Sequence, residues 1–164
     1  SILALLIGKK MGLNPRALED LRYGAILHDI GKIGVPDAVL KKPAQLTVED
    51  WELMHQHPAI GERIIAPLPR FGNAAKIVRH HHERYDGVGY PDRLAQEEIP
   101  IGARILAVVD AYGAIIDKRV YKEGRSHEQA IAEICHCSGA QFDPQIVAVF
   151  LQVIAEQADA EPVP

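Results

Sequence analysis

Helix-start signals recur along the whole chain, and no segment alternates apolar and polar residues in the manner of a strand. Capping residues precede segments with apolar residues at helical spacing at Asn14-Pro15, Thr47, Ser126 and Asp143-Pro144. Side chains of these types accept hydrogen bonds from the free N–H groups of a first helical turn, and proline fits the first helical position. The sequence therefore predicts an all-α fold, built as a helical bundle.

Glycine and proline residues divide the chain into successive helices. Helices are expected over residues 2–11, 15–30, 48–55, 58–66, 71–83, 101–117, 127–137 and 145–157. At roughly 100 to 200 residues per domain, a chain of 164 residues forms one domain. We expect that domain to cover residues 1–157, and we expect the acidic tail, residues 158–164, to be frayed.

The charge of the chain argues against a nucleic-acid-binding protein. It carries 18 basic and 22 acidic residues, which gives a net charge of −4 at pH 7 with neutral histidines. Binding to DNA is therefore not expected. No apolar run approaches the roughly 20 residues that a membrane-spanning helix needs, and two cysteines are too few for a disulfide framework. A cytoplasmic location is the expectation.

Side chains that can bind metal ions stand at the ends of apolar helices or inside one. They are His28, Asp29, His57, His81, His82 and Asp110. Helices packed in a bundle can project such groups toward one point. Asp110 is especially informative because apolar residues surround it in the sequence, and an unpaired buried carboxylate is costly. A metal ion would offset that cost, and a buried salt bridge to an arginine is the alternative.

Four imidazoles and two carboxylates are more ligands than one tetrahedral ion requires. They suit two divalent ions about 3.5 to 4 Å apart, with a carboxylate such as Asp29 bridging them, an arrangement that hydrolyses phosphate esters. Nitrogen and oxygen ligands of this kind accept iron, manganese or zinc. Iron or manganese is the expectation, with zinc and a third ion as the alternatives.

Three motifs follow one another in the sequence. They are His28-Asp29-Ile30-Gly31-Lys32, His57-Pro58-Ala59-Ile60-Gly61 and His81-His82-Glu83-Arg84-Tyr85-Asp86-Gly87-Val88-Gly89-Tyr90-Pro91. Together they resemble the HD-GYP family, the bacterial branch of metal-dependent HD-domain phosphohydrolases that degrades cyclic di-GMP. The match continues through Asp110 to Phe142-Asp143-Pro144. The resemblance implies an HD-domain bundle with a Gly-Tyr-Pro loop that hydrolyses cyclic di-GMP to the linear dinucleotide or GMP in second-messenger signalling.

The resemblance also implies roles for individual residues. The metal ligands would be His28, Asp29, His57, His81, His82 and Asp110. Lys32 would lie beside the metal ions and contact a phosphate or assist the leaving oxygen, so Asp29 and Lys32 are the expected catalytic residues. Arg119 and Lys122 match the positions that hold the cyclic dinucleotide.

Other residues of the third motif are expected to act on the loop. Glu83 and Asp86 would orient the histidines or the loop rather than bind metal. The Gly89-Tyr90-Pro91 loop is associated in the family with contacts to GGDEF-type partners, and a tight turn with a packed tyrosine is the alternative. His80 is expected to be an exposed helix residue. No role is assigned to the remaining histidines, His55, His127 and His136.

Two features depart from the family pattern. Gly113 stands where the family commonly has an aspartate that helps to bind the nucleotide, and the family's glutamate and histidine ligands of the first helix would lie upstream of Ser1. Two alternatives to hydrolysis of cyclic di-GMP therefore stay open. One is a weakened metal- and nucleotide-binding module that recruits GGDEF-type partners, and the other is a hydrolase of another cyclic dinucleotide. An upstream sensor or receiver domain and a homodimer are further expectations.

Overall fold

The computed structural model describes residues 2–117 and 126–160, and every regular element in these two ranges is a helix. The α-helices are α1 (Ile2–Lys10), α2 (Pro15–Leu27), α3 (Asp37–Leu40), α4 (Val48–Met54), α5 (His57–Ile65), α6 (Gly72–His80), α7 (Ile101–Ile116), α8 (His127–His136) and α9 (Pro144–Ala160). Short 3-10 helices form at η1 (Ile30–Gly34), η2 (Pro69–Phe71) and η3 (Gln96–Glu98). The all-α prediction is confirmed.

The predicted capping residues begin their helices as expected. The Asn14 side chain accepts a hydrogen bond from the Ala17 backbone N–H at 2.9 Å. Thr47 and Ser126 each form a reciprocal capping box with the residue three positions later. Asp143 accepts a hydrogen bond from the N–H of Gln145 at 2.8 Å at the start of α9. These helix starts are therefore determined by local sequence.

Helix ends differ more from the expectation than helix starts do. Helix α6 ends at His80, whereas the expected helix continued to Glu83, because the chain turns there into the Gly-Tyr-Pro loop. Helix α9 continues past Gln157 to Ala160, so its regular structure enters the segment expected to be frayed. The short helix α3 was not expected at all. None of the helices in the described ranges is both long and apolar enough to cross a membrane.

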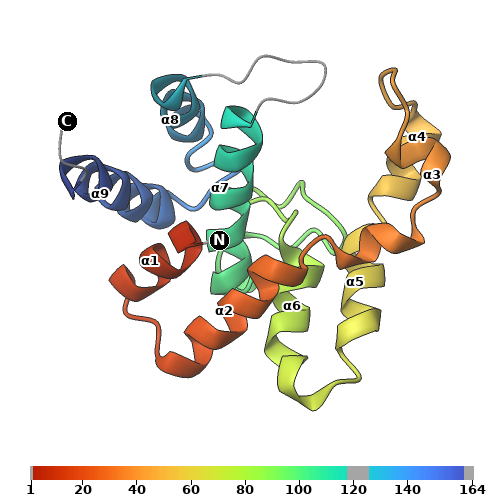
Figure 1. Ribbon diagram of the computed structural model, residues 1–164, viewed down its shortest axis with the longest axis horizontal. Helices are drawn as coiled ribbons and strands as arrows, with labels where there is room; N and C mark the ends of the chain where they lie inside the picture. Colours follow the sequence, from red (N-terminus) through yellow and green to blue (C-terminus); the bar gives the residue numbers. More distant parts are fainter. Residues whose placement is uncertain (1, 118–125, 161–164) are drawn as a thin grey trace.

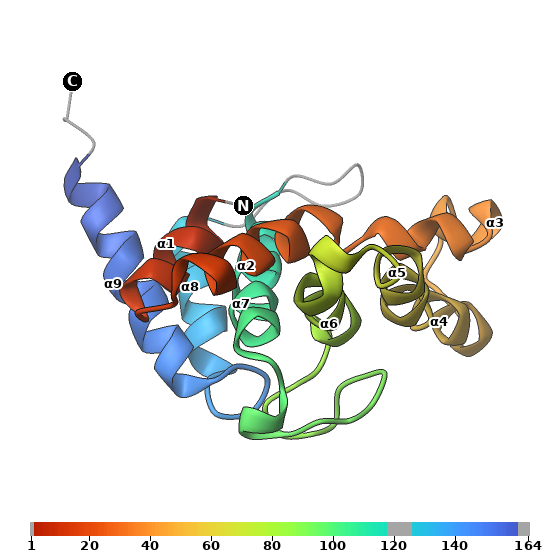
Figure 2. The same cartoon turned by 90° about the horizontal axis from the view of Figure 1, so that it is seen from below.

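Helix α7 forms the centre of the bundle, between α8 and α9 on one side and α3 to α5 on the other (Figures 1 and 2). Its buried residues include Ile105, Val108 and Tyr112, which join one large core with residues of α1, α2, α8 and α9. Phe150 of α9 is completely buried in this core. An ion pair between Arg104 and Asp143, with 2.7 Å between nitrogen and oxygen, also ties α7 to the start of α9.

A close backbone approach positions the segment after α2 against α5. A Cβ atom on Gly31 would lie 1.9 Å from the carbonyl oxygen of His57 and 2.5 Å from the amide nitrogen of Gly61. Only a residue without a side chain fits between these two backbones. The contact therefore brings the residues just before η1 next to the first residue of α5.

Candidate metal centre

The six predicted metal ligands come from four separate parts of the fold and meet at one point. His28 and Asp29 follow α2, His57 begins α5, the two histidines His81 and His82 follow α6, and Asp110 lies in α7. The Nε2 atom of His28 lies 3.5 Å from Asp110 Oδ1 and 3.6 Å from Asp29 Oδ2. Nitrogen atoms of His57, His81 and His82 all lie within 4.8 Å of one another. The structure thus brings together all six residues.

Hydrogen bonds to the backbone orient three of the histidines. His28, His57 and His81 each donate from Nδ1 to the carbonyl oxygen three residues earlier, at 3.0, 2.7 and 2.7 Å. A carbonyl only accepts, so Nδ1 carries the proton and the Nε2 atom of a neutral imidazole keeps a lone pair. The Nε2 atoms of His57 and His81 are 3.4 Å apart. Two lone pairs at this distance repel each other, and a shared cation removes that repulsion.

Burial keeps three imidazoles of the cluster neutral, those of His57, His81 and His82. Desolvation lowers the pKa of His57, lowers the pKa of His81 well below its usual value and lowers that of His82 to about 3. His28 is different: burial lowers its pKa, but the hydrogen bond to Asp110 and the charge of Asp29 together raise it. Neutral imidazoles are the form that binds metal ions. The donor set of the cluster therefore fits divalent metal ions.

Asp29 faces two histidines with its two carboxylate oxygens. Its Oδ1 lies 3.6 Å from Nε2 of His57, and its Oδ2 lies 3.6 Å from Nε2 of His28. Lys32 donates a hydrogen bond from Nζ to the same Oδ2 at 2.7 Å. The two carboxylate oxygens of Asp29 thus face separate histidines, and its bridging of two ions stays a prediction. Lys32 lies at the edge of the cluster, with 40% of its side chain exposed.

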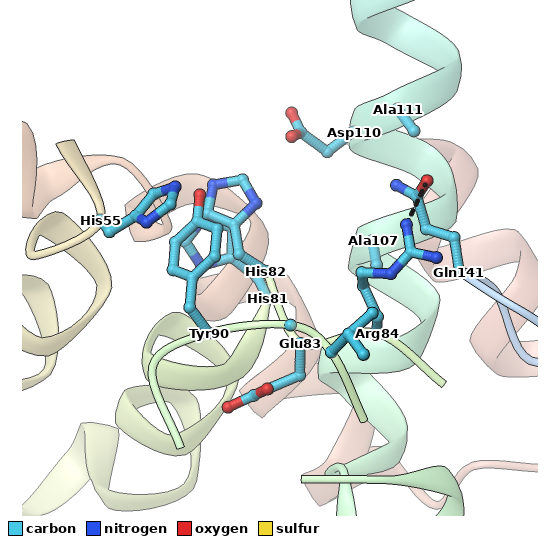
Figure 3. A pocket seen from close by; sticks show the side chains of 12 residues that line it. His55, His81, His82, Glu83, Arg84, Tyr90, Ala107, Asp110, Ala111 and Gln141 are labelled. Atoms are coloured by element: carbon cyan, nitrogen blue, oxygen red, sulfur yellow. Dashed lines mark hydrogen bonds between the residues drawn. The ribbon is translucent and has the colours of Figure 1, made fainter. Parts of the chain in front are cut away.

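A cavity of about 390 Å³ opens beside the ligand cluster. Tyr90 and His82 form one side of it, Arg84 and Gln141 lie across from them, and α7 contributes Ala107, Asp110 and Ala111 (Figure 3). The ring of His55 stacks on that of Tyr90, with centroids 3.9 Å apart. Sequence reasoning missed the pocket residues His55, Arg84 and Gln141. The position of Arg84 directly after the His-His-Glu motif is a signal, whereas nothing in the sequence alone marks the other two.

Glu83 and Asp86 hold the Gly-Tyr-Pro loop by hydrogen bonds to its backbone. The buried Glu83 carboxylate accepts from the N–H of Asp92 at 2.7 Å, and Asp86 accepts from the N–H of Val88 at 3.2 Å. Gly89 packs directly on this segment, since a Cβ atom there would lie 2.3 Å from the Arg84 amide nitrogen. Both acidic residues therefore contact the loop. Orienting the loop is one of the two roles expected for them, and orienting the histidines is the other.

His80 is not the exposed helix residue that the sequence suggested. Only 12% of its side chain is exposed, because the loop folds back beneath the end of α6 and brings Asp92 next to it. The Nδ1 atom of His80 lies 3.7 Å from Glu83 Oε1 and 3.6 Å from Asp92 Oδ2. Arg79 binds both oxygens of Asp92, at 2.6 and 2.7 Å. This network of side chains anchors the far end of the loop.

The two predicted substrate-binding residues, Arg119 and Lys122, lie outside the described residues. The helices on either side are joined by a 2.6 Å hydrogen bond between the Tyr112 hydroxyl and Nδ1 of His127. Gly113 borders open space, since a Cβ atom there would meet nothing within 4 Å. The position therefore has room for the aspartate that the family commonly carries.

The family model of the HD domain matches residues 1–146 of this chain. The chain belongs to the HD domain family. Membership implies divalent metal binding, and His57, His81 and His82 form a group that could hold a metal ion. The histidine and aspartate cluster of this HD domain is the place in the described ranges where six such residues converge.

Known proteins are similar to this HD domain in sequence or in fold. A cyclic di-GMP phosphodiesterase of Thermotoga maritima is 42% identical over 157 residues, which are 93% of this chain and 42% of that protein. A crystal structure of a Vibrio cholerae cyclic GMP-AMP-specific phosphodiesterase superposes with a TM-score of 0.73 at 23% identity, over 95% of this chain and 42% of that one. An HDG"Y"P protein from Bdellovibrio bacteriovorus has a TM-score of 0.70 at 20% identity, over 93% and 49%. The HD domain thus spans less than half the length of each of these proteins, and its resemblance to HD-GYP proteins is confirmed.

Proposed function

We propose that this HD domain hydrolyses a phosphodiester bond of a cyclic dinucleotide, with cyclic di-GMP as the expected substrate and the linear dinucleotide or GMP as product. One observation carries the proposal: neutral imidazoles and two carboxylates converge beside a cavity of about 390 Å³. Relatives described as phosphodiesterases of cyclic di-GMP and of cyclic GMP-AMP support the substrate class.

The residues proposed to hold two divalent metal ions are His28, Asp29, His57, His81, His82 and Asp110. Iron or manganese is the proposed metal, and zinc is the alternative, because nitrogen and carboxylate ligands accept all three elements. A third bound ion is the alternative to two. When bound, such ions supply an activated water molecule and offset the negative charge that develops on the phosphoryl group.

Lys32 is proposed to protonate or hydrogen-bond the departing oxygen. Hydrolysis forms a bond between a water oxygen and phosphorus and breaks the bond from phosphorus to the 3′ oxygen, which leaves with negative charge. The Lys32 ammonium has three N–H groups, of which one binds Asp29 at 2.7 Å, so two remain for the substrate. Asp29 thereby orients the lysine as well as facing two histidines.

Substrate binding is proposed to use the pocket together with Arg119 and Lys122. Tyr90 forms one side of that pocket, and Glu83 and Asp86 hold its loop in place through the hydrogen bonds described above. Basic residues suit a substrate with two phosphates, because the chain as a whole is acidic and anion binding needs local positive charge.

Hydrolysis of several cyclic dinucleotides by the metal-loaded protein tests the proposal. The protein is loaded with Mn²⁺ or Fe²⁺ under anaerobic conditions, and products are separated by chromatography. We expect cyclic di-GMP to be cleaved, chelation to stop cleavage, and Asp29→Asn to reduce it at least 100-fold. Asp37→Asn is the matched control, because Asp37 is exposed and pairs with the exposed Lys41. If every cyclic dinucleotide stays intact with metal bound, the proposal is wrong.

Recruitment of a GGDEF-type partner through the Gly-Tyr-Pro loop is the second candidate function. Val88, in the middle of this loop and beside the pocket, is 71% exposed, so its apolar side chain is accessible to a partner. Titration of the protein with an isolated GGDEF domain tests this function, with Val88→Asp as the variant expected to abolish binding. An unchanged dissociation constant for Val88→Asp would contradict a role of Val88.

A further inference from the structure

The side of the pocket opposite His82 and Tyr90 is built from two loops that are far apart in the sequence (Figure 3). The backbone carbonyl oxygen of Gln141 accepts a hydrogen bond from the backbone N–H of Tyr85 at 3.1 Å. The backbone carbonyl oxygen of Ala140 accepts one from the backbone N–H of Asp86 at 2.8 Å. The backbone N–H of Gln141 itself donates to the Cys137 carbonyl oxygen at 2.9 Å. Gln141 is thus fixed in place before any ligand binds.

The orientation of the Gln141 amide follows from its partner. Arg84 donates from Nη1 to the Gln141 side-chain oxygen at 3.2 Å (Figure 3). A guanidinium only donates, so the accepting atom is the oxygen, and the NH₂ group of the amide faces away from Arg84. Within the described part of the chain this NH₂ group has no hydrogen-bond partner. Gln141 therefore offers two N–H donors to a ligand in the pocket.

The positive charge of Arg84 is already compensated. Its Nε and Nη2 atoms bind the two carboxylate oxygens of Asp86 at 3.1 and 2.6 Å. Because its charge is compensated, Arg84 attracts a phosphate only weakly. The N–H donors of the Gln141 amide are then the main binding groups on this side of the pocket. Ala107 and Ala111, one helical turn apart on α7, provide small apolar side chains next to it. A flat group with hydrogen-bond acceptors on one edge fits these neighbours.

Resting on the proposed function, we propose that Gln141 selects guanine as the base of the nucleotide bound in this pocket. Guanine presents two acceptors, O6 and N7, on one edge, whereas adenine presents the N6 amino group as a donor beside N7. The Gln141 NH₂ group can donate to both guanine acceptors but meets another donor on adenine. Arg84 is a positioning residue that holds the Gln141 oxygen, and Asp86 holds Arg84 in turn.

Two substitutions of Gln141 separate base selection from other roles. Gln141→Met keeps the length of the side chain and removes its donors, and Gln141→Glu replaces the donors with acceptors. We expect Gln141→Met to lower kcat/KM for cyclic di-GMP about 10-fold, with little change for cyclic di-AMP. We expect Gln141→Glu to shift the preference further, toward cyclic di-AMP. Gln152→Ala on the exposed face of α9 is the control expected to change neither rate.

Equal losses for both substrates would show that Gln141 binds a phosphate or supports the pocket, and would overturn base selection, as would unchanged rates. Far-UV circular dichroism checks that each variant is folded. Equilibrium binding of GMP and AMP to the metal-loaded protein provides a readout independent of turnover. If the protein cleaves no cyclic dinucleotide, the proposed function fails, and base selection then stands only if GMP binds more tightly than AMP and Gln141→Met removes the difference.

Discussion

The Nε2 atoms of His57 and His81 lie 3.4 Å apart, and both Nδ1 atoms donate to backbone carbonyls. Neither neutral imidazole therefore has a proton to share with the other at Nε2. Burial lowers the pKa of both groups, so protonation does not resolve the contact. The fold holds these two lone pairs close together, and a bound cation would offset their repulsion. This arrangement is expected of a metal centre that is formed before metal binds.

Metal binding should stabilise the folded protein. A ligand that binds only the folded state at 100 times its dissociation constant adds about 2.7 kcal/mol to the free energy of unfolding. We expect Mn²⁺ to raise the Tm of the protein and His81→Ala to remove most of this increase, because His81 is 1% exposed in the centre of the cluster. Calorimetry with and without metal measures the effect, and His136→Ala on α8 is the control. An equal rise in Tm for His81→Ala would contradict its assignment as a ligand.

Gly31→Ala should disrupt the contact between η1 and α5. The added Cβ atom would lie 1.9 Å from the His57 carbonyl oxygen, and backbone atoms on both sides leave it no room. We expect a loss of about 2 kcal/mol or more in the free energy of unfolding, measured in urea, together with weaker metal binding.

Gly113→Ala is the matched control for this substitution. Its Cβ atom would meet nothing within 4 Å, and alanine favours a helix by about 1 kcal/mol over glycine. We expect the free energy of unfolding to rise slightly. Equal effects of the two substitutions would show that the close approach at Gly31 is not restrictive.

Lys32→Met should affect the chemical step rather than metal binding. Loss of a positioned proton donor typically lowers a rate about 100- to 10,000-fold. We expect kcat for cyclic di-GMP to fall by at least 100-fold, with the metal content by elemental analysis and KM little changed. Lys41→Met is the control, since Lys41 is exposed and pairs with the exposed Asp37. A rise in KM with kcat unchanged would assign Lys32 to substrate binding and not to departure of the oxygen.

Gly113→Asp should strengthen nucleotide binding. The position is three residues after Asp110 on α7, so its side chain would lie on the same side of the helix, and there is open space for it. A new hydrogen bond to a carboxylate is worth about 1.5 kcal/mol, so we expect the dissociation constant for cyclic di-GMP to fall about 10-fold. Isothermal titration on the metal-loaded protein measures it. An unchanged constant would mean that glycine at this position does not limit affinity.

Acid should weaken the anchoring of the Gly-Tyr-Pro loop. The hydrogen bond from Arg79 lowers the pKa of Asp92 below its usual 3.8. A depressed carboxyl pKa contributes stability above the unfolded-state value, and this contribution is lost as pH falls through the folded-state value. We expect Asp92→Asn to destabilise the protein at pH 7 but much less below about pH 3.8. Urea unfolding of both proteins at pH 7 and below about pH 3.8 measures this. The same difference in free energy of unfolding at both pH values would contradict the role of the ion pair.

Local features of the sequence predicted much of the fold. Asn14, Thr47 and Ser126 act on N–H groups within three residues, so their helices begin where expected. The ligand set was predicted from residue types and family motifs, and Asp110 in an apolar helix was its most informative member. Each of these residues lies next to a helix end or on a helix, where a short sequence window carries the information.

Long-range contacts could not be predicted in the same way. Gln141 reaches the pocket because its loop pairs with the backbone of Tyr85 and Asp86, more than fifty residues away in the chain. His80 is covered by Asp92 only because the loop folds back beneath α6. Both outcomes depend on the tertiary path of a loop, and the sequence of the loop by itself does not contain that path.

A titration of activity against bound metal tests the central claim most directly. Metal-free protein is supplied anaerobically with increasing Mn²⁺ or Fe²⁺, and bound metal and cleavage of cyclic di-GMP are measured on the same samples. The account predicts that the rate rises with occupancy, reaches its plateau at two ions per chain, and is absent at every metal concentration in Asp29→Asn. A fully loaded protein that leaves cyclic di-GMP and every other cyclic dinucleotide intact, or a rate independent of bound metal, would contradict it.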